Sequence, residues 1–366
     1  MENNQGRDKT VDIKNTNSIE SNFRKIVPYT PGDQPDLPDM IKLNTNESPY
    51  PPSPKVIEAG AAFDETTLKL YPSTDAADLR KALAKYHGFT PDRVFVGVGS
   101  DDVLSMIFQS CFNSGLPILF PEVTYSFYEV WAALYRIQYR TIPLRWDFTI
   151  DCRGYIGREN GGIVIANPNA PTSIVMPLSD IEVIVANNPG RIVVIDEAYI
   201  DFGGESALPL LDKYDNLIVV RTFSKSRSLA GLRIGYAISS AQIIKAIEDV
   251  KYSVNSYPMN RPSIEMGVAS IEDEEYFRAM ISKITSSRKY LTDELEKLGF
   301  TVLPSSTNFL FVTHKTVSAE KIYTELKERH IFVRHFKKPL IDNYLRITIG
   351  TQEQCEKLLE AIGNIL

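Results

Sequence analysis

Seven short apolar runs, rich in β-branched residues, are the feature that most limits how this chain can fold. They read RVFVGVG, PILF, YRTIPL, GIVIAN, RIVVID, NLIVVR and RIGYAIS. Stretches with helical spacing of apolar residues, such as 178–187, separate several of these runs. Buried strands that alternate with helices are typical of a largely parallel sheet with helices on both faces. We therefore predict an α/β fold with a mostly parallel seven-stranded sheet.

The pattern changes toward both ends of the chain. From about residue 260 it becomes a long helix (275–298), the strand NFLFV, a helix (318–329), two further strands and a final helix. Residues 27–54 contain so many prolines that no long helix can form there, and the residues before them lack hydrophobic periodicity. The predicted organisation is a flexible extension (1–25), an extended arm (26–54), a large α/β domain (55–258) and a smaller α+β domain (259–366).

Composition excludes several classes of protein. Hydrophobic residues make up 43% and charged residues 23%, which is ordinary for a globular protein, and the net charge of −6 argues against nucleic acid as a partner. The three cysteines form no C-x-x-C pair, and the four histidines show no metal-binding spacing, so we expect no disulfide and no metal. No run of about 18 apolar residues occurs, so we expect no membrane association and a cytoplasmic location.

Polar residues follow the apolar runs at the points where ligands bind in a parallel sheet, the carboxyl ends of the strands. After RVFVGVG, Gly99 lets the backbone approach a phosphate, and Ser100 is the expected N-cap of a helix whose first N–H groups, including that of Asp101, are free. The alternative to a phosphate site is that these residues form an ordinary strand-to-helix turn. A nicotinamide-dinucleotide site is disfavoured because the third glycine of G-x-G-x-x-G is missing.

Two charged residues end neighbouring buried runs. Asp196 follows RIVVI, where an unpaired carboxylate is costly, so it needs a cation: a protonated cofactor ring nitrogen or a structural arginine. Lys225 follows NLIVV, where desolvation would lower its pKa and free the amine to attack a carbonyl, although a lysine can also extend to solvent. Thr222, Ser224 and Arg233 could all bind one phosphate beside it.

A Schiff-base lysine, a carboxylate for a pyridinium and a phosphate-binding group are what pyridoxal phosphate requires. With these residues the chain resembles the fold-type I, class I/II aminotransferases, and within them most closely the histidinol-phosphate aminotransferases. The resemblance covers about residues 25–366. It rests on LNTNESPYPPSP, YPSTDAADLR, GVGSDDVL, NPNAPT, VVIDEAYIDF, RTFSKSRSLAGLRIGY and YLRITIGT.

The resemblance implies a role for each matching residue. Lys225 would bind the cofactor as a Schiff base and move a proton between Cα and C4′, Asp196 would keep the ring nitrogen protonated, and Tyr199 would hydrogen-bond O3′. Tyr125 would stack on the ring, and Tyr71 would reach the phosphate from the other subunit of a homodimer. The phosphate itself would be held by Gly99, Ser100, Asp101, Thr222, Ser224 and Arg233.

One motif departs from the family pattern. Where members usually read N-P-N-N-P-T-G, this chain reads NPNAPTS, with Ala170 in place of the asparagine that commonly contacts O3′ and Ser173 in place of glycine. We assign that contact to Asn169. The change is expected to alter cofactor tuning and to preserve the chemistry, because Tyr199 remains as a donor.

Arginines near the C-terminus indicate an anion pocket, since a guanidinium suits bidentate capture of carboxylate or phosphate. The resemblance places the substrates against Arg346, with Arg334, Tyr29 and Asn46 completing the pocket, although Arg334 could equally form a surface ion pair. It implies amino transfer from L-glutamate to imidazole acetol phosphate in histidine biosynthesis. The alternatives are an aromatic aminotransferase, a threonine-phosphate decarboxylase and, less favoured because no basic recognition helix is available, a non-catalytic cofactor-binding regulator.

Overall fold

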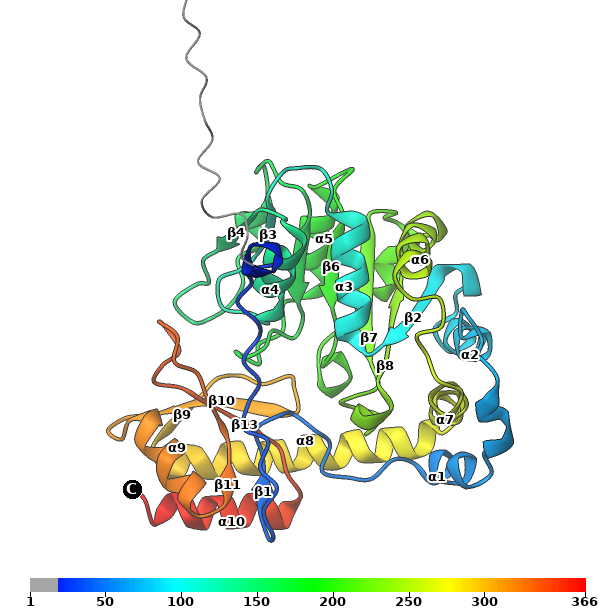
Figure 1. Ribbon diagram of the computed structural model, residues 1–366. Coiled ribbons are helices and arrows are strands. Elements are labelled where there is room, and N and C mark those ends of the chain that lie inside the picture. The colour runs from blue at the N-terminus through cyan, green and yellow to red at the C-terminus, as the bar shows by residue number, and fades with distance from the viewer. Residues whose placement is uncertain (1–18) are drawn as a thin grey trace, which may run out of the picture.

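A seven-stranded sheet forms the centre of the larger half of the molecule (Figure 1). The structure, a computed structural model, describes residues 19–366, so most of the predicted flexible extension lies outside the described residues. The strand order is β2-β8-β7-β6-β5-β3-β4, and β8 alone runs antiparallel to its neighbours. The mostly parallel sheet is thus confirmed. Its strands are β2 (Val94–Val98), β3 (Ile118–Pro121), β4 (Tyr139–Ile142), β5 (Ile163–Ala166), β6 (Val193–Asp196), β7 (Leu217–Thr222) and β8 (Ile234–Ile238).

Both faces of this sheet are covered by helices, because the strands are apolar on both sides. In β6, Val193 and Ile195 belong to one hydrophobic core and Val194 to the other, as the two-residue period of a strand requires. The first core includes side chains of α1 (Pro54–Ala61), α2 (Ala77–His87), α5 (Leu178–Ala186) and α7 (Arg261–Ile271). The second includes side chains of α3 (Ser100–Cys111), α4 (Phe127–Tyr135) and α6 (Ala241–Val254).

A smaller antiparallel sheet follows in the chain, with the order β12-β13-β10-β9. Its strands are β9 (Phe300–Val302), β10 (Phe309–His314), β12 (Arg334–His335) and β13 (Leu345–Thr348). Three helices share its core: α8 (Glu274–Lys297), α9 (Ala319–Glu328) and α10 (Gln352–Gly363). Figure 1 shows the long α8 running from the region of α1 and α7 to this sheet. This α+β unit agrees with the fold class expected from the sequence.

The segment before α1 has no α-helix among its described residues, as its prolines predict. A two-residue strand, β1 (Ile41–Lys42), pairs in parallel with β11 (Ile331–Phe332) and so attaches the arm beside the smaller sheet. Ser53 then caps α1 by accepting a hydrogen bond from Val56 N–H, with Pro54 at the first helical position. The arm therefore enters the large unit from the side of the small one.

Short 3₁₀ helices complete the described secondary structure: η1 (Ile19–Asn22), η2 (Glu65–Lys69), η3 (Pro91–Arg93), η4 (Cys152–Tyr155), η5 (Ile200–Phe202), η6 (Leu208–Asp212) and η7 (Ala230–Leu232). In residues 19–366, no helix combines the length and apolarity needed to cross a bilayer. The domain boundaries at 55 and 259 remain predictions. Ile264 and Ile271 of α7 pack in the core of the large sheet, which favours a boundary after α7.

Candidate active site

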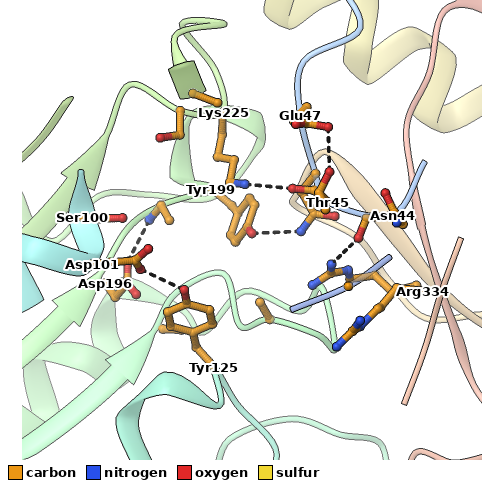
Figure 2. Close-up of a pocket in the computed structure, with 18 of the residues that line it drawn as sticks. Asn44, Thr45, Glu47, Ser100, Asp101, Tyr125, Asp196, Tyr199, Lys225 and Arg334 are labelled. Carbon is orange, nitrogen blue, oxygen red and sulfur yellow. Dashed lines mark hydrogen bonds between the residues drawn. The ribbon is translucent and has the colours of Figure 1, made fainter. Parts of the chain in front are cut away.

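The carboxyl ends of the large-sheet strands open into a cavity whose opposite wall comes from the arm and the smaller sheet. Figure 2 shows Lys225, Tyr199 and Asp196 on the large-sheet side and Thr45 and Arg334 across from them. Most of the residues predicted for the site line this cavity. They are Tyr29, Asn46, Ser100, Asp101, Tyr125, Asp196, Tyr199, Ser224, Lys225, Arg233, Arg334 and Arg346.

The turn between β2 and α3 forms one end of the cavity. The N-cap of α3 is Gly99, at a φ of 86°, so the prediction that Ser100 is the N-cap is wrong by one residue. Glycine suits this left-handed conformation, and a Cβ at Gly99 would lie 2.5 Å from Arg233 Nη2. Ser100 and Asp101 become the first two helical residues. Their N–H groups have no partner within the helix, which makes the end of α3 suitable for an anion.

Two hydroxyl residues, Thr222 and Ser224, lie at the end of β7, near the same end of the cavity. Thr222 Oγ1 donates to Ser224 Oγ at 3.0 Å and accepts from Ser224 N–H at 3.1 Å. Ser224 lines the cavity. Thr222 lies behind Ser224 and orients the Ser224 hydroxyl through these hydrogen bonds. Arg233 Nη2 lies 3.8 Å from Asp101 Oδ2, and its side chain is 45% exposed. Its guanidinium is therefore available to a phosphate at the N-terminus of α3.

Asp196, at the end of β6, is a buried carboxylate. Its Oδ2 accepts a hydrogen bond from Tyr128 O–H at 2.8 Å, and its Oδ1 accepts one from Ala198 N–H at 3.2 Å. Burial raises the pKa of Asp196 to about 6, against the effect of these hydrogen bonds. Among residues 19–366 it forms no salt bridge, so the cation expected from the sequence is not supplied by this part of the chain.

Lys225, in the turn after β7, is partly buried in the cavity wall. Its Nζ donates to the carbonyl oxygen of Thr45 at 3.1 Å (Figure 2). Burial, helped by the positive charge of Arg346, lowers the pKa of Lys225 to about 8. The amine is thus more readily neutral and nucleophilic than an ordinary lysine.

Tyr199 lies between Lys225 and the small sheet. Asn46 Nδ2 donates to the Tyr199 phenolic oxygen at 2.9 Å, which leaves the hydroxyl hydrogen of Tyr199 free to point into the cavity. The Asn46 side chain is fixed in turn by Thr348 Oγ1, which donates to its Oδ1 at 3.0 Å. The arm and β13 therefore set the direction of the phenol.

Tyr125 forms the floor of the cavity beside Asp196. Its hydroxyl donates to Asp101 Oδ1 at 2.8 Å (Figure 2), so the ring is anchored at its polar end. Tyr29 comes from the arm and stacks on Phe127 with ring centroids 4.2 Å apart. Two aromatic rings from distant segments thus border the same cavity.

Arg334 and Arg346 stand directly opposite each other on the antiparallel strands β12 and β13. Like charges in such a cross-strand pair repel, and neither arginine forms a salt bridge within the described part of the chain. Arg346 donates one hydrogen bond, from Nη2 to Asn44 O at 2.8 Å, while its buried Nε has no partner among the described residues. Burial lowers the pKa of Arg346. An anion between the two guanidinium groups would relieve the repulsion.

Besides Gly99 and Thr222, which lie behind residues of the cavity wall, two further predicted site residues do not line the cavity. Asn169 is buried behind it, and its side chain bonds to Val123 O, Thr172 Oγ1 and Thr124 Oγ1. Ala170 lines the cavity instead. Tyr71 is 78% exposed and stacks on the ring of Tyr257, with centroids 4.7 Å apart. The structure thus does not bring Asn169 or Tyr71 to the site within one chain.

Sequence reasoning missed three residues that shape the site: Thr45, Glu47 and Tyr128. Thr45 O accepts from Lys225, and Glu47 lines the cavity while bonding Lys42 at 2.7 Å. Both lie in LNTNESPY, a motif that the sequence singled out without assigning them. Tyr128 follows Tyr125 by three residues in PEVTYSFYEVW, but Tyr125 lies before α4, and a tyrosine among apolar residues gives no signal of its own. Among the described residues no cluster of three potential metal ligands occurs.

Known proteins resemble the chain over nearly its whole length. The family model described as aminotransferase class I and II matches residues 38–362. Histidinol-phosphate aminotransferase 2 of Dechloromonas aromatica (strain RCB) is 50% identical over 345 residues, which cover 93% of this chain and 97% of that protein. Histidinol-phosphate aminotransferase of Lactococcus lactis subsp. cremoris (strain MG1363) is 51% identical over 349 residues, covering 95% and 98%. The structure is similar to histidinol-phosphate aminotransferase from Sinorhizobium meliloti in complex with pyridoxal-5′-phosphate, with a TM-score of 0.82 and 27% identity over 89% of this chain and 90% of that one.

Proposed function

Because the chain belongs to the aminotransferase class I and II family, we propose that it transfers the amino group of L-glutamate to imidazole acetol phosphate. The products are 2-oxoglutarate and L-histidinol phosphate, so the reaction is a step of histidine biosynthesis. The observation that carries this assignment is the pair Arg334 and Arg346, which face each other across β12 and β13 at the cavity. Such a pair suits a substrate with a strongly anionic group.

The cofactor is pyridoxal phosphate, and the donor set of the cavity fits it. Asp196 is a buried acid without a cationic partner in the described chain, which matches a protonated ring nitrogen. The free N–H groups at the start of α3, with Ser224 and Arg233, match a phosphate. Lys225 supplies the amine for the cofactor aldehyde.

The chemistry that bound pyridoxal phosphate supplies is an aldehyde carbon reactive toward amines and a ring that withdraws electrons from the substrate Cα. Asp196 favours that withdrawal by holding a proton on the ring nitrogen. Tyr199, whose hydroxyl hydrogen is left free by Asn46, would donate it to the phenolic oxygen of the cofactor. Lys225 Nζ would take the proton from the substrate Cα and return it, and its lowered pKa makes it a competent base near neutral pH.

Both substrates must use the same anion site in turn. Arg346 binds the glutamate α-carboxylate and then contributes to binding the acceptor phosphate, with Arg334 and Tyr29 beside it. The Nε of Arg346, buried without a partner in the described chain, gives the guanidinium a second donor for bidentate binding. Asn46 affects the site indirectly, because its hydrogen bond to Tyr199 sets the direction of the Tyr199 hydroxyl.

We place the second copy of the chain over an exposed apolar surface made by two segments, 68–71 and 252–257. Leu68, Leu70 and Val254 are 62%, 56% and 58% exposed, and the stacked rings of Tyr71 and Tyr257 join the two segments. Apolar patches of this kind commonly mark protein interfaces. A homodimer would cover the patch and bring Tyr71 to the partner's cofactor phosphate. The three unpaired cysteines fit a reducing cytoplasm.

Steady-state turnover tests the proposal. With glutamate as donor, imidazole acetol phosphate should be a far better acceptor than phenylpyruvate, because only the former carries a phosphate for Arg334 and Arg346. Preference for phenylpyruvate would instead indicate an aromatic aminotransferase. Release of carbon dioxide from threonine phosphate would indicate the decarboxylase and overturn the proposal.

A further inference from the structure

Tyr128 is a fully buried residue of α4 that the mechanism above does not use. Its hydroxyl donates to Asp196 Oδ2 at 2.8 Å, and both side chains lie in the interior. The only other hydrogen bond to this carboxylate in the described chain comes from Ala198 N–H, at the longer distance of 3.2 Å. Tyr128 thus donates the shorter of the two hydrogen bonds that Asp196 accepts, and both come from neutral donors.

The surroundings of Tyr128 hold its hydroxyl in place. Its ring packs against Phe108, Phe120 and Trp131, with centroid distances of 6.3, 5.9 and 6.3 Å. It also meets Tyr125 edge to face at 5.7 Å, at an interplanar angle of 87°. A ring fixed on several sides leaves its O–H little freedom, so the hydrogen bond to Asp196 is preorganised.

Asp196 needs this support because its negatively charged neighbours oppose ionisation of the Asp196 carboxyl group. The titratable groups facing it are Tyr128 on α4, Asp101 on α3 and, just beyond β6, Glu197 and Tyr199. The negative charges of Asp101 and Glu197 disfavour a carboxylate at Asp196, although Glu197 is itself paired with Arg221 at 3.0 Å.

We propose that Tyr128 is a positioning residue that keeps Asp196 ionised and aimed at the ring nitrogen of pyridoxal phosphate. This inference rests on the proposed function. With Tyr128 donating to Oδ2 and Ala198 donating to Oδ1, each oxygen retains a lone pair for the ring N–H. Without the tyrosine hydroxyl, the shared proton moves from the ring nitrogen toward the carboxylate, and the ring withdraws electrons less strongly.

The test is Tyr128→Phe, which removes one oxygen atom from the core, in holoenzyme loaded with pyridoxal phosphate labelled with ¹⁵N in the ring. Its ¹⁵N chemical shift reports the ring protonation directly. The ratio of protonated to unprotonated nitrogen should fall about ten-fold, as expected for loss of a hydrogen bond to a charged group. The acid limb of the pH–rate profile should move up by about one pH unit, because a less stabilised carboxylate has a higher pKa.

Tyr155→Phe is the matched control. Tyr155 is equally buried, but its hydroxyl has no partner in residues 19–366. This variant should keep the wild-type ¹⁵N shift and pH profile. Melting temperatures of both variants show whether folded proteins are being compared.

Asp196→Asn separates a charge effect from packing. Adding Tyr128→Phe to Asp196→Asn should cause no further change in the ¹⁵N shift, since no carboxylate remains to stabilise. An unchanged shift in the single Tyr128→Phe variant, or an equal change in both backgrounds, would overturn the inference. A wild-type protein that fails to bind pyridoxal phosphate at Lys225 would instead refute the proposed function itself.

Discussion

Burial shifts the pKa values of Lys225 and Asp196 in opposite directions. Desolvation disfavours the charged form of each group, so it lowers the pKa of the lysine to about 8 and raises the pKa of the acid to about 6. Between these values the amine can release its proton while the carboxylate stays charged. A covalent cofactor with a protonated ring requires this combination.

The apoprotein should therefore capture pyridoxal phosphate faster as the pH rises, and the rate should level off above about 8. The sign follows from the lowered pKa: the neutral, nucleophilic amine predominates above about pH 8 rather than above the usual lysine value. Borohydride quenching at set times, followed by peptide mapping, measures the capture. Label on Lys213 or on the buried Lys251 would contradict the assignment, and Lys225→Ala should remove the label.

Tyr199 should matter more here than in relatives that keep the usual asparagine, because Ala170 offers no second donor at the cavity wall. Tyr199→Phe removes the O–H donor to the cofactor, and affinity for pyridoxal phosphate should fall by about 10- to 100-fold. Ala170→Asn in the Tyr199→Phe background should restore part of it, measured by titration of the apoprotein. No recovery would mean that position 170 does not reach the phenolic oxygen.

Sequence patterns predict charged site residues better than the residues behind them. Lys225 and Asp196 were predicted because a charged group at the end of a buried strand is energetically costly unless it has a partner or a function. Tyr128 was missed because a tyrosine among apolar residues looks like ordinary core. The O3′ contact assigned to Asn169 remains a prediction, and the structure commits that amide to Val123 and Thr172, because loop contacts depend on tertiary packing that no local pattern encodes.

At the level of elements, the strands of the large sheet other than the edge strand β4 were predictable because each is a largely apolar run of four to six residues. The two-residue pairing of β1 with β11 was not, since so short a run has no periodic signal. The start of α3 was placed one residue late because the backbone turns at Gly99, whose positive φ suits glycine and not the side-chain cap that the sequence pattern predicted. That turn fixes which N–H groups are left free at the N-terminus of α3.

The cross-strand pairing of β12 with β13 predicts unequal roles for its two arginines. Arg346→Ala should lower kcat/KM for glutamate and for the acceptor by a factor equivalent to about 2–5 kcal/mol, because the Nε of Arg346 is buried without a partner among the described residues and an anion bound there would be shielded from water. Arg334→Ala should cost less, since the hydrogen bond that Arg334 donates to Thr30 O is exposed, whereas the one that Arg346 donates to Asn44 O is partly buried.

Arg329→Ala is the control for this pair of variants. Arg329 is exposed at the end of α9, where it pairs with Glu325, and its loss should leave the kinetics unchanged. Unchanged glutamate kinetics in Arg346→Ala would show that this arginine is structural.

For the molecule as a whole, the exposed Tyr71 predicts that each active site is completed by the other subunit. Tyr71→Phe should weaken cofactor binding by about 10- to 100-fold, the value of a hydrogen bond to a charged phosphate. Consider a heterodimer of one Tyr71→Phe chain and one Lys225→Ala chain. If Tyr71 of each chain serves the partner's site, one site carries both substitutions and the other carries neither. Activity at limiting cofactor should return to about half of wild type per dimer. If Tyr71 serves its own chain, every site carries one defect and no recovery follows.

Isotope transfer tests the central claim most directly. Purified protein is given ¹⁵N-labelled L-glutamate and imidazole acetol phosphate, and the products are analysed by mass spectrometry, with Lys225→Ala as the control. The account predicts that the ¹⁵N label appears in the amino group of L-histidinol phosphate with an equal amount of 2-oxoglutarate, and that Lys225→Ala forms neither. Absence of label from histidinol phosphate with the wild-type protein, or labelling that persists in Lys225→Ala, would contradict it.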